Sequence, residues 1–308
     1  MINVHSDIKT QFSAHILQLQ NEICKALEDA DGKAKFRKDK WQRPGGGGGI
    51  TCVIQSGNIF EKGGVNTSSV EGAVTDTMKQ QLNIAGEYFF ACGISLVLHP
   101  QNPFVPTVHA NFRYFELYDA TKTLIDSWFG GGTDLTPYYL SGEDNTHFHR
   151  TLKQACDEYD ADFYTKYKKT CDEYFVNTHR NNESRGIGGI FFDYLRADEK
   201  RSAELWLKFV KSCSHSLLPA YLPIVEKRRN NLYSAEQKYW QEIRRGRYAE
   251  FNLLHDRGTL FGLKTNGRTE SILMSLPPTV RFDYDYCPAK GSEEEKITEV
   301  LLHPRSWI

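Results

Sequence analysis

The sequence predicts an α+β fold, in which a large and mostly antiparallel β-sheet is flanked by helices on both sides. Two observations support this class. Short alternating or apolar runs come in consecutive pairs separated by turn residues, as the strands of hairpins do. Helical stripes lie between groups of these runs, without the regular strand–helix–strand alternation of parallel sheets. Since no internal repeat or change of composition divides the chain, we expect its 308 residues to form a single domain.

The first half of the chain is predicted to contain one helix and several hairpins. Apolar residues recur with helical spacing over residues 7–28, which belong to an N-terminal section of helix and connector covering residues 1–40. The glycine run at 45–49 is expected to be a flexible connector or a close backbone approach, since no Gly-Lys-Ser/Thr follows to make a phosphate loop. The segments that follow are expected as strands at 50–55 and 58–61, a loop at 62–72, a central hairpin at 93–116, a strand at 124–129 and a glycine-rich turn at 130–134.

The second half is predicted to be more helical. A capping box formed by Ser234 and Gln237 opens one of its helices, and the dipeptide Asn266-Gly267 is a signal for a two-residue turn. In chain order we expect a helix at 146–176, a strand at 186–194, helices at about 198–218 and 235–245, strands at 248–254, 259–264 and 271–275, and a short amphipathic helix after Ser292.

Composition excludes several functional classes. The formal net charge is −1, so neither nucleic acid nor an anionic membrane is an expected partner, and an acidic ligand would need individually placed arginines. Seven cysteines without a C-x-x-C pair indicate reduced thiols rather than a disulfide framework. The N-terminus lacks a basic segment followed by an apolar run, and the longest apolar run, residues 88–98, is too short for membrane insertion. We therefore expect a cytoplasmic protein.

The central hairpin is the candidate active site. Residues His109, Asn111 and Arg113 alternate with apolar residues, so they share one face of a strand, and Ser95 and His99 share a face of the preceding strand. If residues 100–106 close an antiparallel turn, the two polar sets come within cross-strand contact distance. A half-solvated strand without function is the alternative. Histidine, asparagine and arginine are specific hydrogen-bonding groups, however, and they favour a functional surface.

Long motifs give the chain a family resemblance. They are GNIFEKGGVN (57–66), HPQNPFVPTVHANFRYFE (99–116), WFGGGTDLTPYY (128–139), RGIGGIFFD (185–193) and EFNLLHDRGTLFGLKTNGRTESILMSLPP (250–278). Together they resemble the oxygen-dependent coproporphyrinogen III oxidases over nearly the whole chain. The resemblance implies oxidative decarboxylation of two propionates of coproporphyrinogen III to vinyl groups, which gives protoporphyrinogen IX in haem biosynthesis. It also implies dioxygen as co-substrate and no flavin, haem or nicotinamide.

The resemblance also assigns roles to residues. Guanidinium groups bind carboxylates bidentately, which suits Arg113 and Arg268 to the substrate's propionates. The other implied substrate-binding residues are Ser95, Asn111, Phe112, Asn266 and Gly267. Asp193 is expected under the macrocycle, where an ionised carboxylate accepts pyrrole N–H bonds, with Arg180 near it, and His109 is expected to be the proton donor. A divalent metal is associated in the family with the histidines matching His99, His109, His149 and His179.

Further expectations concern assembly and departures from the family pattern. The segment at about 248–283 resembles the family's dimer-forming region, which implies a homodimer. Tyr194 stands where a second aspartate is common, the loop after His179 is one residue longer than in many members, and Cys52 replaces a common arginine. Two other functions stay open at this point: a metal-dependent oxygenase acting on another anionic substrate, and a tetrapyrrole-binding protein without turnover.

Overall fold

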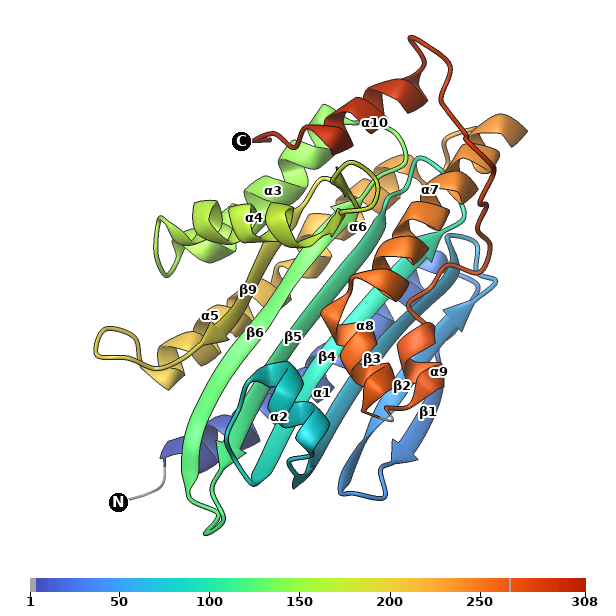
Figure 1. Cartoon of the computed structure of the whole chain (residues 1–308). Coiled ribbons are helices and arrows are strands. Elements are labelled where there is room, and N and C mark those ends of the chain that lie inside the picture. Colours follow the sequence, from blue (N-terminus) through green and yellow to red (C-terminus); the bar gives the residue numbers. More distant parts are fainter. Residues whose placement is uncertain (1–3, 266) are drawn as a thin grey trace.

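The computed structural model describes residues 4–265 and 267–308. Within that part, seven strands form one antiparallel sheet (Figure 1). Their bounds, in spatial order, are β1 (Arg37–Gln42), β2 (Gly47–Gln55), β3 (Phe60–Ala73), β4 (Tyr88–Pro100), β5 (Thr107–Tyr118), β6 (Leu124–Thr136) and β9 (Gly189–Leu195). Two short strands, β7 (Val176–Asn177) and β8 (Glu183–Ser184), pair with each other. The predicted fold class is confirmed.

Helices cover both faces of the sheet, as Figure 1 shows. Behind it lie α1 (Val4–Asp31), α5 (Ala203–His215) and α6 (Leu217–Arg228), and in front lie α2 (Asp76–Leu82), α7 (Ala235–Leu254), α8 (Arg257–Lys264) and α9 (Thr269–Leu273). The helices α3 (Gly142–Asp157) and α4 (Phe163–Tyr174) lie beyond the β6 and β9 side of the sheet, and α10 (Glu293–Leu302) lies across the end of the sheet where β6 ends. No helix in the described ranges is long and apolar enough to cross a bilayer.

Strand alternation separates a hydrophobic back face from a polar front face. The back face carries Ile94, Leu96, Phe112 and Phe129, which belong to the main core together with Phe12 of α1. These side chains are almost completely buried, and at about 25 cal/mol for each Å² of apolar surface their burial is the main stabilising contribution. The opposite positions of the same strands face α7, α8 and α9. We call this side the front face.

The predicted helix at 7–28, the central hairpin and the capping box of α7 are confirmed. The hairpin at residues 50–61 is also present, but β3 continues through residues 62–72, where we expected a loop, and the glycines at 130–132 lie inside β6 rather than in a turn. The single helix expected at 146–176 is two helices, α3 and α4. The elements β1, α2 and α6 were not predicted.

The strands predicted over residues 248–275 are wrong, because this region is helical. The buried residues Tyr248, Ala249, Phe251 and Asn252 follow the spacing of a helix face rather than alternation, and they extend α7 across the sheet. Asp256 then accepts a hydrogen bond from the backbone N–H of Thr259 and caps the start of α8. Tertiary packing on the sheet therefore decides the structure of a segment whose residues are also frequent in strands.

Candidate active site

The register of β4, β5 and β6 brings the predicted polar residues together on the front face. Ser95 lies opposite Asn111, and His109 lies opposite Asp134. Arg113 lies opposite Gly130, and β9 next to it carries Asp193 on the same face. Cross-strand neighbours of this kind have Cβ atoms about 5 Å apart. The front face therefore gathers amide, hydroxyl, guanidinium and carboxylate groups near the middle of the sheet.

Arg113 and Asp193 form an ion pair at the centre of this surface. Nη2 of Arg113 lies 2.7 Å from Oδ2 of Asp193, and Nη1 donates to Oδ1 of Asn111 at 2.9 Å. The pair crosses β6 over Gly130, where a Cβ atom would lie 2.6 Å from Oδ1 of Asp193 and 2.8 Å from Cζ of Arg113. A larger residue at position 130 would therefore displace one or both of these side chains from their observed positions.

The ion pair keeps free hydrogen-bonding capacity for a ligand. The side chains of Arg113 and Asp193 are 36% and 18% exposed. The guanidinium has five N–H groups, of which two are used here, and the carboxylate has about four acceptor positions, of which Arg113 and the backbone N–H of Tyr194 occupy two. An anionic ligand can therefore bind the arginine while a ligand N–H binds the aspartate.

His109 is connected to a buried ion pair. Its Nδ1 lies 2.8 Å from Oδ1 of Asp134, whose two carboxylate oxygens each accept a hydrogen bond of 2.8 Å from Nη2 of Arg185. Asp134 and Arg185 are 1% and 2% exposed. Burial by itself would raise the pKa of Asp134, but the charge of Arg185 and the hydrogen bond from His109 outweigh it, so the pKa is lowered. Asp134 is thus an ionised carboxylate inside the protein.

His99 is a structural residue rather than a ligand-binding one. It is fully buried, and burial together with the charge of Arg245 lowers its pKa well below the usual value, so the ring is neutral. Its Nε2 donates to the carbonyl of Ser275 at 2.8 Å, and its Nδ1 accepts from the hydroxyl of Thr107 at 3.2 Å. The ring thereby connects the end of β4 to the segment after α9, and both nitrogens are used.

His149 and His179 lie in other parts of the fold. His149 is fully buried in α3, where its Nε2 donates to the carbonyl of Ile187 and its Nδ1 accepts from Tyr164. Burial and the charge of Lys168 lower its pKa to about 3. His179 is exposed and contacts His255 and Glu250.

The expectation of one metal site formed by His99, His109, His149 and His179 is therefore wrong. The described residues contain no group of three or more His, Cys, Asp or Glu side chains arranged to hold a metal ion. Of the four rings, the described contacts leave only His109 with an open nitrogen, Nε2. The donor set does not fit a shared ion, and no step proposed below uses one.

Two further predictions are corrected by the structure. The Phe112 side chain points into the back core, where it contacts Phe192, because it alternates with Asn111 and Arg113. Arg180 was expected near Asp193, but both its Nε and Nη2 bind the carboxylate of Glu250 instead. The residue that holds Asp193 is Arg113.

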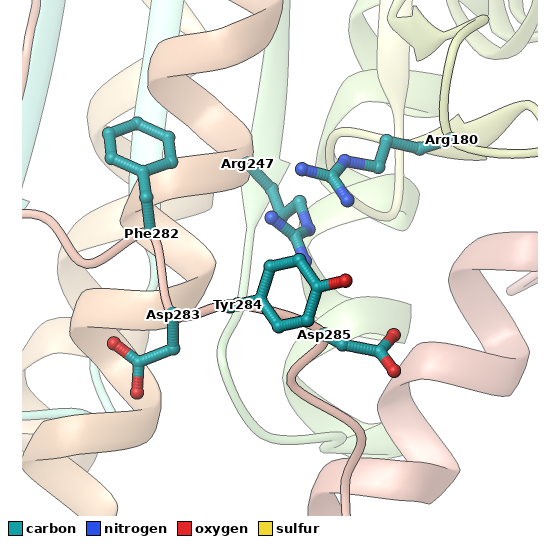
Figure 2. Close-up of a pocket in the computed structure, with 6 residues that line it drawn as sticks. All are labelled: Arg180, Arg247, Phe282, Asp283, Tyr284 and Asp285. Carbon is teal, nitrogen blue, oxygen red and sulfur yellow. The ribbon is translucent and has the colours of Figure 1, made fainter.

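Arg180 lies in a separate open pocket of about 500 Å³ (Figure 2). Arg247, which also binds Glu250, lies beside it, and Phe282, Asp283, Tyr284 and Asp285 complete the lining. In Figure 2 the side chains of Arg180 and Arg247 approach each other from the right and from the left. The Tyr284 ring lies below them, partly in front of Arg247. The pocket is formed by α7, the turn between β7 and β8 and the segment before α10, so it is distinct from the central part of the front face.

The residues expected around position 267 lie at the edge of the front face. Arg268, before α9, pairs with Asp39 of β1 and donates to Ser271 at 3.1 Å. Asp39 and Arg113 are separated by four strand spacings, or about 19 Å. The N–H of Gly267 donates to the carbonyl of Gly262, and Asn266 lies outside the described residues. Arg268 shares the face of Arg113, but the two guanidinium groups could only bind opposite ends of a large ligand.

Four residues near the centre of the front face were not predicted. They are Asp134 and Arg185, Asn252, which accepts from Nη1 of Arg185 at 2.8 Å, and Arg257, whose guanidinium lies over Tyr174 and over Phe191 of β9. Asp134 continues the alternation of β6 and could have been found from it. Asn252 and Arg257 could not, because their position depends on how α7 and α8 cross the sheet.

Comparisons with known proteins show the family to which the chain belongs. A family model described as coproporphyrinogen III oxidase matches residues 11–307. A mitochondrial oxygen-dependent coproporphyrinogen-III oxidase of Rattus norvegicus is 50% identical over 312 residues, which cover 98% of this chain and 69% of the relative. A chloroplastic enzyme of the same name from Glycine max is 50% identical over 314 residues, covering 98% and 80%. One from Drosophila melanogaster is 50% identical over 303 residues, covering 95% and 76%.

Proposed function

Because the chain belongs to the coproporphyrinogen III oxidase family, we propose that it converts two propionates of coproporphyrinogen III to vinyl groups, giving protoporphyrinogen IX in haem biosynthesis. Dioxygen is the co-substrate. Each reacting propionate group of the substrate loses carbon dioxide and a hydride equivalent. Dioxygen accepts the two electrons and becomes hydrogen peroxide. The observation that carries the proposal is the Arg113–Asp193 pair, which offers a cation and an anion side by side on an accessible sheet face.

Arg113 binds a propionate of the substrate. Its guanidinium is held in position by Asn111 and Asp193, so little conformational entropy is lost when a carboxylate binds to the remaining N–H groups. Ser95 lies directly opposite Asn111 and supplies a neutral hydroxyl donor. Arg268 stays the predicted ligand of a second, distant propionate, and its pairing with Asp39 has to open or be shared for this role.

Asp193 binds the pyrrole N–H groups of the flexible macrocycle. A carboxylate that accepts these bonds makes the ring electron-rich, and we infer that the ring itself then reacts with dioxygen. The resulting ring-bound peroxide takes a propionate β-hydrogen as a proton. The bond between ring carbon and oxygen then breaks and, with one further proton, hydrogen peroxide is released. The electron pair freed as carbon dioxide leaves forms the vinyl group and restores the pyrrole. His109 donates or accepts a proton at Nε2, since its Nδ1 is bound to Asp134. The protein contributes binding, orientation and electrostatics to this reaction.

We further propose that the chain acts as a single domain in a homodimer. The proposal rests on the resemblance of the segment 248–283 to the family's dimer-forming region. This segment carries the exposed apolar residues Leu253, Leu254, Leu263 and Phe282, which are 41%, 57%, 38% and 58% exposed and which a second copy of the chain could cover. The seven cysteines are free thiols, six of them buried, which supports a reducing compartment such as the cytoplasm. The absence of flavin, haem and nicotinamide, and of nucleic acid as a partner, stays a prediction.

The test is a single-turnover experiment with metal-stripped protein. Coproporphyrinogen III is added without oxygen, air is then admitted, and carbon dioxide and the divinyl product are measured. We expect two carbon dioxide molecules and one divinyl product for each substrate. Binding without carbon dioxide would indicate a tetrapyrrole-binding protein, and turnover that returns only with one added metal would indicate a metal-dependent oxygenase. Either outcome would contradict the proposal.

A further inference from the structure

We propose that Asp134 and Arg185 are positioning residues, which hold His109 in the tautomer with hydrogen on Nδ1 and keep Nε2 directed at the substrate. The proposal rests on the proposed function for the role of His109 in the reaction. It concerns two residues that touch neither Arg113 nor Asp193, and it assigns them an effect that passes through the imidazole ring.

The first argument concerns the hydrogen between His109 and Asp134. An ionised carboxylate has no hydrogen to donate, so the 2.8 Å contact with Oδ1 requires the hydrogen to be on Nδ1. Nη2 of Arg185 also lies near Nδ1, at 3.4 Å, and would favour the opposite tautomer. The shorter, charge-assisted contact with the carboxylate is the stronger of the two.

The second argument is that Asp134 is itself held rigidly. Both of its oxygens are bound by Arg185, whose Nη1 donates to Asn252. The guanidinium lies 4.1 Å from the ring centre of Phe175 and 4.7 Å from that of Tyr248. The carboxylate that orients the imidazole therefore has one defined position, fixed from α7 and from the chain entering β9.

The third argument is energetic. Burying an ion pair costs desolvation energy that its own attraction barely repays, and apolar side chains of similar volume are often at least as stabilising. A structural requirement alone thus gives no reason for this pair at 1% and 2% exposure. The ion pair makes one additional contact, with His109. Among His109, Asp134 and Arg185, only the His109 side chain is appreciably open to the front face. The arrangement has the logic of a base oriented by a third group.

The geometry predicts the tautomer directly, and this can be measured on the free protein. Protein labelled with ¹⁵N in its histidines is studied by long-range ¹H–¹⁵N correlation spectroscopy, with the His109 signals assigned by their absence in His109→Gln. We expect the Nδ1–H pattern in the wild type. In Asp134→Asn the new amide can donate to Nδ1, so we expect a shift toward the Nε2–H pattern. This readout does not depend on turnover, so it separates failure of the inference from failure of the proposed function.

Kinetics supply the second readout. For Asp134→Asn we expect kcat for coproporphyrinogen III to fall at least a hundredfold while KM changes less than threefold, since the variant leaves Arg113 and Asp193 in place. Arg185→Lys, which keeps a positive charge but loses the two-pronged geometry, should give a smaller loss in kcat. It also keeps the test open if Asp134→Asn does not fold.

The matched control is Asp126→Asn. Asp126 lies on the same strand and binds Arg196 through two nitrogens, but it is partly exposed and far from His109. We expect its kcat to equal that of the wild type. In a His109→Gln background, Asp134→Asn should cost no further activity, because the residue acts through the ring. An Nε2–H tautomer in the wild type, an unchanged kcat in Asp134→Asn, or losses that simply add in the double variant would each overturn the proposal.

Discussion

Gly130→Ala tests whether the position of the Arg113–Asp193 pair controls activity. The substitution leaves every functional group in place and adds one methyl group between the two side chains. Its Cβ would lie 2.6 Å from Oδ1 of Asp193, whereas ordinary contacts begin at 3.4 Å. The difference means that the carboxylate must move by about 0.8 Å, and Arg113, with Cζ at 2.8 Å, must move with it.

The expected cost can be worked from this displacement. Overpacking costs typically about 1–3 kcal/mol, and we expect the lower end because both clashing groups are ends of side chains that can shift. A misplacement of about 1 Å at a reacting centre can cost about a hundredfold in rate. The variant should therefore stay folded, with a free energy of unfolding lower by about 1 kcal/mol, while kcat/KM falls by about a hundredfold.

The assay measures carbon dioxide release and divinyl product against coproporphyrinogen III concentration, with thermal unfolding in parallel. Gly142→Ala is the matched control, since a Cβ there would meet nothing within 4 Å and the residue opens α3 far from the pair. The control should keep wild-type activity. A Gly130→Ala protein with kcat/KM within twofold of the wild type would refute the idea that the pair must occupy its observed position.

Two further predictions concern stability. His149 has a folded-state pKa of about 3, below its unfolded value of about 6.5, so the unfolded chain binds more protons at acid pH. Because of this residue, the free energy of unfolding should fall by up to about 1.4 kcal/mol per pH unit as the pH drops below 6.5. His149→Gln, which can keep both hydrogen bonds, should remove that part of the pH dependence in urea titrations between pH 7 and 5, and an unchanged slope would contradict the assignment. Asp31 accepts backbone hydrogen bonds from Ala34, Asn58, Ile59 and Phe60, which outweigh burial and lower its pKa. Asp31→Asn should therefore lower the free energy of unfolding at pH 7 by about 3 kcal/mol. The difference from the wild type should shrink as the pH falls through the range in which the Asp31 carboxylate becomes protonated. A difference that does not depend on pH would show that the charge is not responsible.

Local periodicity predicted the centre of the fold and of the site. The alternation in the central hairpin placed His109, Asn111 and Arg113 on one face, and the register confirms that Ser95 lies opposite Asn111. Strands paired by hairpins make contacts near in sequence, so the pattern of one segment is enough to place its side chains. The same rule shows why Phe112 had to face the core.

Contacts between segments that are far apart in the chain could not be predicted from the sequence. The Arg113–Asp193 pair joins β5 to β9 across β6, and it depends on Gly130 having no side chain. Arg185 reaches Asp134 from a loop more than fifty residues later. The metal expectation for His99 and His149 came from the family resemblance, and the sequence could not show that both are core residues whose ring nitrogens are already hydrogen-bonded.

The sequence analysis also did not predict the helices that cover the front face over residues 248–275. Residues 248–275 contain many apolar and aromatic residues and no helical stripe that stands out, because the segment is divided among α7, α8 and α9 with a capped start at Asp256. Their helical state is fixed by packing on the front face. Arg257 and Asn252 are brought to the site by this packing alone, and so only the structure could identify them.

The most direct test of the account is the affinity of Arg113 variants for the substrate. Coproporphyrinogen III is titrated without oxygen, so that binding is measured before any chemistry, into the wild type, Arg113→Ala and the double variant Arg113→Ala/Asp193→Asn. Removing the guanidinium should weaken binding by about 2–5 kcal/mol, a change in Kd of about thirtyfold or more. The double variant, which leaves no unpaired carboxylate behind, should still bind at least tenfold more weakly than the wild type. A dissociation constant for either variant within threefold of the wild-type value would show that the macrocycle binds elsewhere than at the centre of the front face.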